Sequence, residues 1–363
     1  MNLEPIDIAV VGSGAAGIGA AVTCARQGLA TLLLDQRASA GGTGGFSGLT
    51  TLCGCYDDQG RLLSEGFARE FVGQLAEREP VPMGRVWVLP YRPERFRQVA
   101  ETLIEENENL SVRWNTSLGG VVVENEEIKS INGFAVGAVI DCSGTAEAAR
   151  AAGAECFETT PATQAPAIVF PLCNVTRDLS TPAAAAQVLL PLSRAGFPAL
   201  FFQPNLEPNT VTVKFSGEAK HIPETIAFLR ANLAGFENAA TPVSEFKEAR
   251  RAGRMIRGKY VLTGADVLSG RKFPDAVARC AWPIEQWDTE GRVRLRYLTK
   301  GDFYEIPAGA LRALTIRNLF MGGKTISADV EAIASARVMG CCLATGAAAG
   351  NLAAQWLSSD GSK

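Results

Sequence analysis

The chain of 363 residues contains 47% hydrophobic and 20% charged residues and has a formal net charge of −3. These values are typical of a soluble globular protein with one large or two ordinary domains. The weak negative balance and the sparse basic runs, such as RPERFR, argue against a nucleic-acid-binding protein. No apolar run reaches the roughly 18 residues of a membrane span. We therefore expect a cytoplasmic protein that acts on a small molecule, with no membrane or nucleic-acid partner, and the sequence leaves a homodimer open.

The nine cysteines are scattered and form no CxxC motif. This pattern is typical of a reducing compartment, where most thiols serve as small packing residues. It also lacks the spacing that an iron–sulfur cluster needs. Because His221 is the single histidine, a histidine-rich metal site is excluded, and no metal is expected. His221 itself is expected to be a surface or helix-capping residue rather than a base.

The first apolar segment, Ile6–Val11, is predicted to be a buried parallel strand. It leads into the GxGxxG motif Gly12–Gly17 and then into a helical pattern that ends near Gln27. A second predicted strand, Ala30–Asp35, ends in a carboxylate eighteen residues after the motif. In such strand–turn–helix units the glycines and the helix N-terminus approach a pyrophosphate, and the acid accepts hydrogen bonds from ribose hydroxyls. The segment therefore predicts a dinucleotide-binding site.

Later segments repeat the combination of a strand followed by small residues. They are RASAGGTGG after the second strand (37–45), AVIDCSG (138–144) and NLFMGG (318–323). The last of them leads into a long helix that is predicted to begin at about Ala334. A hairpin with its turn near Asn125-Glu126 is predicted before the second segment.

With these motifs the chain resembles the FAD-dependent oxidoreductases that include the glutathione-reductase-like and fumarate-reductase-like flavoproteins. The resemblance is carried by the GxGxxG motif, by Arg37–Gly42, by the YEIP stretch Tyr304–Pro307 and by the segment Arg337–Gly350. It covers most of the chain and is weak only in the region of about 176–241. Departures from the family pattern occur where Glu285-Gln286-Trp287 replaces a frequent histidine and where Gly340 to Cys342 replace a usual proline.

The resemblance implies an α/β fold class. It implies a Rossmann-like FAD-binding domain, with a parallel sheet and helices, plus an inserted mixed α+β substrate-binding or cap domain. The FAD-binding domain would be discontinuous, with residues 1–160 and 315–363, and the cap would span residues 161–314.

The resemblance also implies which residues hold the cofactor FAD. The glycine turns would approach the diphosphate and the adenosine, and hydroxyls such as that of Ser47 would face flavin N5. The C-terminal helix would direct its positive end at the flavin pyrimidine ring. The expected FAD-binding residues are Gly12, Gly14, Ala15, Ala16, Gly17, Asp35, Gln36, Arg37, Gly41, Gly42, Thr43, Ser47, Cys142, Ser143, Gly144, Gly322, Gly323, Val338 and Met339.

Three residues are candidates for the reaction itself. Tyr304 is expected near the pocket mouth, either as a proton donor or acceptor or as a packed aromatic side chain. Cys53 lies in the segment expected under the isoalloxazine and either touches flavin or substrate or is a buried thiol. Arg337 is expected to open the last helix, where it would bind an anionic substrate group or flavin O2, or form a structural ion pair. Arg254 and Arg257 are further candidates to clamp a carboxylate.

The sequence thus predicts an FAD-dependent oxidoreductase that passes a hydride between a small organic substrate and flavin N5. A flavin monooxygenase, a peptide-modifying flavoenzyme and a non-catalytic FAD-binding partner protein stay open as alternatives, because no motif in the cap identifies a substrate. The adjacent Cys341 and Cys342 are expected to be packing residues.

Overall fold

A seven-stranded sheet forms the centre of the computed structural model, which describes residues 6–159, 164–246, 248–249, 251, 253–288 and 292–360. Its order is β6-β2-β1-β9-β8-β7, and β20 joins it by pairing with β9. Neighbours among β6, β2, β1, β9 and β20 are all parallel, whereas β7 and β8 extend the sheet as an antiparallel hairpin. The strands are β1 (Ile6–Val11), β2 (Thr31–Leu34), β6 (Leu110–Arg113), β7 (Val121–Glu124), β8 (Glu127–Ile131), β9 (Phe134–Asp141) and β20 (Leu319–Met321).

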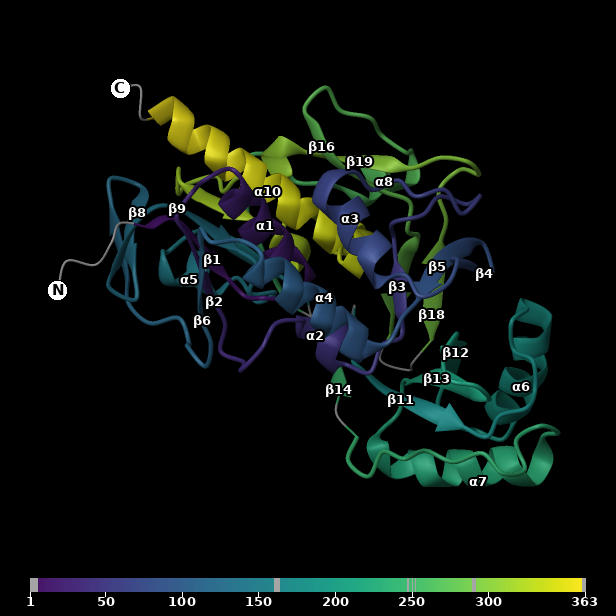
Figure 1. Cartoon of the computed structure of the whole chain (residues 1–363). Helices are drawn as coiled ribbons and strands as arrows, with labels where there is room; N and C mark the ends of the chain where they lie inside the picture. The colour runs from purple at the N-terminus through teal and green to yellow at the C-terminus, as the bar shows by residue number, and fades with distance from the viewer. Residues whose placement is uncertain are drawn as a thin grey trace.

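Alternate residues of the strands point to opposite faces of this sheet, so both faces are apolar and each is covered by a layer of its own. From β1, Ile8 and Val10 join the core under the long helices, while Ala9 and Val11 join a second core on the other face. Figure 1 shows the long helices gathered over one face, with α10 lying along α1. The helices around the sheet are α1 (Ala15–Arg26), α3 (Gly66–Leu75), α4 (Pro93–Glu105), α5 (Glu147–Ala151) and α10 (Met339–Asp360).

The hairpin of β7 and β8 turns where the sequence predicts it. Asn125 and Glu126 both have a positive φ, of 50° and 62°. This conformation matches the right-handed twist of a two-residue hairpin.

A second sheet, of order β12-β13-β11-β14, builds the cap and is antiparallel throughout. Two helices pack on it and give it a hydrophobic core of its own, which includes Phe170, Val213 and Leu229. Figure 1 shows this unit at the lower right, away from both chain ends. Its elements are β11 (Ala167–Cys173), α6 (Pro182–Arg194), β12 (Leu200–Gln203), β13 (Thr210–Phe215), α7 (Ile222–Asn232) and β14 (Glu248–Ala249).

Several smaller antiparallel sheets complete the structure. Their strands are β3 (Thr51–Cys53), β4 (Val81–Met83), β5 (Val86–Pro90), β10 (Cys156–Glu158), β15 (Arg254–Ile256), β16 (Ala276–Cys280), β17 (Ile284–Trp287), β18 (Val293–Arg296) and β19 (Tyr304–Pro307). The short helices are α2 (Gly42–Phe46), α8 (Gly264–Leu268) and α9 (Val330–Ala336). The α/β class with a parallel sheet is therefore confirmed, whereas the proposed domain boundaries stay a prediction.

The C-terminal helix does not begin at Ala334, and that prediction is wrong. The side chain of Asp329 caps α9, which ends at Ala336, and α10 begins at Met339 at an angle of 97° to it. The break follows from packing, since α9 contacts β17 whereas α10 contacts α1. No single described helix is both long and apolar enough to cross a membrane, and only the bent pair of α9 and α10 reaches those limits together.

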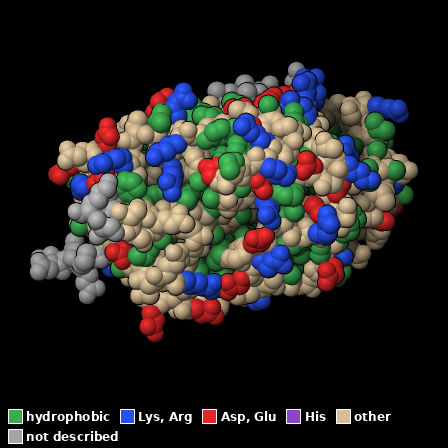
Figure 2. All heavy atoms as spheres, turned by 90° about the horizontal axis from the view of Figure 1, so that it is seen from above, with side chains coloured by type: hydrophobic (Ala, Val, Ile, Leu, Met, Phe, Trp, Pro, Cys, Tyr) green, Lys and Arg blue, Asp and Glu red, His purple; other side chains and the backbone are tan. Residues whose placement is uncertain are grey.

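Charges on the surface are of mixed sign. On the face in Figure 2, Lys and Arg side chains lie among Asp and Glu side chains. Many charged side chains of the protein pair with an opposite charge, as Arg26 does with Glu70 and Arg257 with Glu155.

Candidate functional site

The glycine-containing turns that the sequence predicts as a nucleotide site meet at one edge of the central sheet. They follow β1, β2, β9 and β20, which run parallel and therefore end at the same edge. The turns touch one another closely. A Cβ added to Gly42 would lie 2.7 Å from Gly14 Cα, one added to Gly12 would lie 2.6 Å from the carbonyl oxygen of Cys142, and one added to Gly322 would lie 3.2 Å from Cys142 Sγ.

The N-terminus of α1 presents backbone donors at this edge. No side chain caps the helix at Gly14, and its first turn carries no acidic residue. The N–H groups of Ala15 and Ala16 therefore remain for a ligand, together with the positive end of the helix dipole. Gly17 lacks space for any side chain, because its Cβ would lie 1.6 Å from the carbonyl oxygen of Gly12.

Asp35 lies directly after β2 and faces the same turn. Its carboxylate accepts hydrogen bonds from Ser13 N at 2.6 Å, from Ser13 Oγ at 2.7 Å and from Arg37 N at 2.8 Å. A carboxylate offers about four acceptor positions, so these contacts leave room for a ribose hydroxyl. Gln36 and Arg37 are exposed beside it.

The turns from β2 into α2 and after β9 hold the other predicted cofactor residues. Gly41 and Gly42 both have a positive φ and open α2. Thr43 is exposed, and Ser47 donates its hydroxyl hydrogen to the Thr43 carbonyl oxygen at 2.6 Å. After β9, Ser143 Oγ donates to Asp141 at 2.7 Å, which holds the turn through Gly144. Each of these turns is therefore organised by its own backbone and short side chains.

The start of α10 lies beside this edge of the sheet. Gly323 packs between α1 and α10, because a Cβ added to it would lie 2.9 Å from Ala16 Cβ and 3.4 Å from Cys342 Sγ. The first intrahelical bond of α10 runs from Cys342 N to the Val338 carbonyl oxygen, so the N–H groups of Met339 to Cys341 precede it. A Cβ on Gly340 would lie 2.6 Å from the Cys53 carbonyl oxygen. The N-terminus of α10 therefore packs against the segment that follows α2.

Arg337 occupies the break between α9 and α10 and does not open a helix. Its Nη2 donates to Gln164 Oε1 at 2.8 Å, and its Nε is buried with no hydrogen-bond partner among the described residues. Burial lowers the pKa of Arg337, and the charges of Glu285 and Cys342 oppose this effect.

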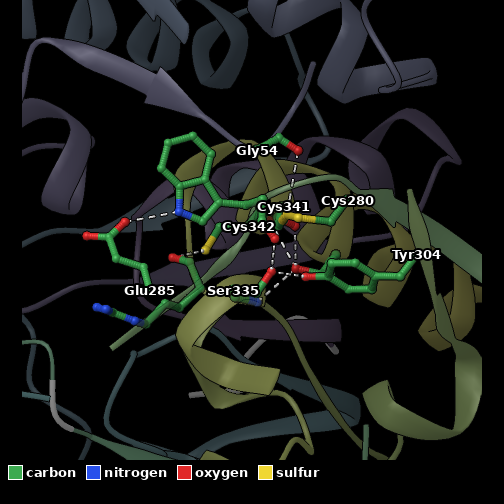
Figure 3. Close-up of a disulfide and its surroundings, with 11 residues drawn as sticks. Gly54, Cys280, Glu285, Tyr304, Ser335, Cys341 and Cys342 are labelled. Atoms are coloured by element: carbon green, nitrogen blue, oxygen red, sulfur yellow. Dashed lines mark hydrogen bonds between the residues drawn. A yellow bond between two sulfur atoms is a disulfide. The ribbon is translucent and has the colours of Figure 1, made fainter. Parts of the chain in front are cut away.

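Tyr304 is completely buried and does not reach a pocket mouth, so its predicted placement is wrong. Figure 3 shows its ring directed at Ser335, whose hydroxyl lies 2.8 Å from Tyr304 Oη. Ser335 in turn donates to the Trp282 carbonyl oxygen at 2.5 Å. Burial raises the pKa of Tyr304 above its usual range. These contacts correspond to the alternative of a packed aromatic side chain.

Cys53 is buried at the end of β3, with its Sγ 3.7 Å from the Thr51 carbonyl oxygen. Burial raises its pKa to about 11, and the charge of Lys214 only partly opposes this. The group is therefore a protonated thiol at neutral pH rather than a ready nucleophile.

Cys341 is buried, as expected of a packing residue, but it is not a free thiol. It forms a disulfide with Cys280, with 5.8 Å between the two Cα atoms (Figure 3). The two cysteines are 61 residues apart in sequence, and only the pairing of β16 with the start of α10 brings them together. The other seven cysteines are free, and Cys24, Cys53, Cys55, Cys142 and Cys342 among them are buried.

A buried cluster of charges next to Arg337 escaped the sequence analysis. Its centre is Glu285, which accepts hydrogen bonds from the indole nitrogens of Trp287 at 2.6 Å and Trp282 at 3.1 Å. Lys214 Nζ lies 4.0 Å from the same carboxylate. Burial disfavours the charge of Glu285, but Lys214, Arg337, the Trp287 hydrogen bond and Arg251 together lower its pKa to about 2. Glu285 is therefore ionised in the core.

Arg251 also belongs to this cluster, whereas Arg254 and Arg257 do not. The Arg251 guanidinium lies 4.1 Å from the ring centroid of Trp287, and its Nη1 donates to the Ala165 carbonyl oxygen at 2.6 Å. Arg254 and Arg257 form exposed ion pairs with Glu158 and Glu155 instead. The prediction that those two arginines clamp a substrate is therefore wrong, because both side chains are turned to the surface, where each pairs with a glutamate.

His221 forms the N-terminal cap position of α7. Its carbonyl oxygen accepts a hydrogen bond from Thr225 Oγ1 at 2.7 Å. This is a helix-end role, as the sequence predicts.

The chain belongs to the FAD dependent oxidoreductase family, whose model matches residues 7–195 and 203–362. It is thus an FAD-dependent oxidoreductase, and the resemblance inferred from its motifs is confirmed. No curated protein sequence matches the chain.

Solved structures of flavoproteins share the fold. A geranylgeranyl bacteriochlorophyll reductase-like protein from Thermoplasma acidophilum is 14% identical, with a TM-score of 0.53 over 98% of this chain and 80% of that one. GidA from Aquifex aeolicus is also 14% identical, with a TM-score of 0.55 over 99% of this chain but only 64% of its own length. The flavin-dependent brominase Bmp2 is 12% identical, with a TM-score of 0.51 over 97% of this chain and 79% of that one. These reactions differ, so the fold leaves the specific chemistry open.

The residues of the site fit FAD. The turn at Gly14 leaves backbone donors uncapped, Gly42 meets it without side chains, and Asp35 keeps acceptor capacity at the end of β2. The start of α10 supplies a second set of helix N-terminal donors nearby. Two helix N-termini at one sheet edge suit a molecule with a diphosphate and an electron-accepting ring.

Proposed function

We propose that this enzyme passes a hydride between a small organic substrate and N5 of FAD. When bound, FAD supplies the two-electron chemistry, and the protein binds and orients the partners. The observation that carries the proposal is the position of the charge cluster. Arg337 lies just before α10, and its charge acts on Glu285, which Lys214 of the cap sheet also approaches. Substrate groups held by the cluster would therefore lie beside the cofactor edge.

The residues of the chain have distinct tasks in this proposal. The N–H groups at the start of α1 bind the diphosphate, and Asp35 accepts from the ribose. The positive end of α10 and Arg337 favour negative charge on the bound partners. The side chains of Tyr304 and Cys53 are buried, and because burial raises both pKa values, both groups hold their protons at neutral pH. No side chain is therefore assigned as the base.

The test is anaerobic reduction of the purified holoenzyme by candidate hydride donors, followed at the flavin absorbance band near about 450 nm. Donors would include hydroxy acids, amino acids, amines, alcohols and reduced nicotinamide. Bleaching by an organic donor, with one product molecule for each flavin reduced, supports the proposal. It is overturned if only reduced nicotinamide bleaches the band and the reduced enzyme then consumes oxygen with an added aromatic substrate, which is the behaviour of a monooxygenase.

A further inference from the structure

The cluster around Glu285 holds more positive than negative charge. Lys214, Arg251 and Arg337 all act on Glu285, and Lys324 lies close enough to Arg337 for the two charges to interact. Among the residues that the structure describes, Glu285 is the carboxylate that acts on Arg251 and Arg337. Buried charge without a counter-ion is costly. The surplus therefore indicates an anion that completes the cluster.

The two guanidinium groups of the cluster also have N–H donors that its hydrogen bonds do not use. Each oxygen of Glu285 accepts a hydrogen bond from the indole group of Trp282 or Trp287, and among the described residues no ion pair joins this carboxylate to either guanidinium. Among the described residues, Arg251 donates to the Ala165 carbonyl oxygen alone, and the Nε of Arg337 has no partner. A guanidinium has five N–H donors in a planar fork that matches a carboxylate.

Two groups of cations can be separated by their positions. Lys324 and Arg337 lie on the FAD-binding side, because Lys324 Cε would lie 3.9 Å from a Cβ on Gly144 and Arg337 precedes α10. Lys214 comes from β13 of the cap sheet, and Arg251 stacks on Trp287 of β17. The FAD diphosphate already has the start of α1 as its binding group. Lys214 and Arg251 therefore remain for a different anion.

We propose that the substrate carries a carboxylate, which binds to Lys214 and Arg251 next to Arg337. Lys214 keeps 16% of its side chain exposed and Arg251 is half-buried, so both can be reached, unlike the fully buried Tyr304. The stacked Trp287 holds the Arg251 guanidinium in one orientation. This inference rests on the proposed function, since it names the substrate class of that reaction.

The experiment measures binding rather than turnover. Holoenzyme would be titrated with acetate, oxalate and benzoate and with the neutral acetamide, oxamide and benzamide, while the flavin absorbance spectrum is recorded. We expect at least one carboxylate to perturb the spectrum with saturation, and its amide to bind at least ~10-fold more weakly. If none of the carboxylates perturbs the spectrum, or if the amides bind as well, the inference is overturned.

Variants assign the effect to residues. Lys214→Met and Arg251→Met should each weaken carboxylate binding at least ~10-fold while the FAD content stays that of the wild type. Arg251→Lys should bind carboxylates more weakly than Lys214→Arg does, because a lysine at position 251 cannot form the forked contact of a guanidinium. The matched control is Arg254→Met, whose exposed guanidinium pairs with Glu158 outside the cluster. A different result would refute the inference. If the Lys214 and Arg251 variants lose FAD, while the holoenzyme that remains binds carboxylates as the wild type does, these cations serve the cofactor.

The two proposals fail in different ways. Saturable carboxylate binding without reduction by any organic donor would refute hydride transfer and leave the anion site standing. Reduction by an uncharged donor at a rate that Lys214→Met does not change would refute the carboxylate and leave hydride transfer standing.

Discussion

The FAD-binding edge and the cap meet their ligands by different means. At the edge, the turns after β1, β2, β9 and β20 present backbone groups, and the side chains there are mostly glycine, alanine and serine. Beside the cap, the proposed substrate site consists of charged side chains such as Lys214 and Arg251 around Glu285. A site built from backbone leaves a short-range signature in the sequence, whereas a site built from long side chains leaves none.

The largest expected effect tests how closely the backbones pack in the FAD-binding region. A Cβ on Gly346 of α10 would lie 1.9 Å from the carbonyl oxygen of Ala16 in α1, so Gly346→Ala must push the two helices apart. We expect the free energy of unfolding to fall by more than about 4 kcal/mol, because backbone atoms rather than a flexible side chain would have to shift. Urea unfolding followed by circular dichroism measures it.

The matched control is Gly73→Ala in α3, where an added Cβ meets nothing within 4 Å. That change should stabilise the helix by roughly 0.5 kcal/mol or more. Equal stability of the two variants would contradict the close contact between α1 and α10.

The disulfide between Cys280 of β16 and Cys341 of α10 gives the next effect. Because it closes a loop across a sequence separation of 61, its reduction should lower the free energy of unfolding by about 4 kcal/mol. Urea unfolding with and without dithiothreitol measures the difference, and Cys280→Ala should show no response to the reductant. Alkylation of the unreduced, denatured protein should label seven cysteines, and labelling of all nine would rule the bond out.

The pH dependence of stability tests the role of Glu285 in the charge cluster. Its pKa is about 2 in the folded protein against 4.5 as an ordinary value, so it stabilises the fold above about pH 4.5 and loses that contribution as the pH falls toward about 2. A shift of this size corresponds to about 3 kcal/mol at neutral pH. Glu285→Gln should therefore be less stable than wild type at neutral pH, and the gap should narrow as the pH falls through this window.

The control for that comparison is Glu158→Gln, which removes the exposed pair with Arg254 and should cost no more than about 1 kcal/mol. Urea midpoints at several pH values provide the data. A gap between wild type and Glu285→Gln that is independent of pH would show that Glu285 acts by packing alone.

The smallest effect separates ligand binding from folding at the FAD-binding edge. Gly14 has an extended backbone, and its Cβ would meet Gly42 Cα only at 3.9 Å, so Gly14→Ala should fold as the wild type does. The new methyl group would stand where a diphosphate approaches, and we expect FAD to bind at least ~10-fold more weakly. The ratio of flavin to protein absorbance after dialysis measures this loss. Full flavin retention would show that the diphosphate lies elsewhere.

The sequence by itself determined the Rossmann-like unit. The apolar run Ile6–Val11, the spacing of Gly12, Gly14 and Gly17, and the carboxylate of Asp35 are local features. A tight turn and a helix N-terminus depend on residues that are neighbours in the chain. The turn at Asn125-Glu126 was predictable for the same reason. The family assignment confirms this part of the reading.

Only the tertiary structure decided which distant side chains meet. Cys280 and Cys341 are joined across 61 residues, Arg251 rather than Arg254 turns inward, and Tyr304 is directed at Ser335 in the core. The break at Arg337 also depends on packing, since α9 and α10 rest on different elements. Such contacts arise from the meeting of separate surfaces, and residue type and spacing along one segment carry no information about them.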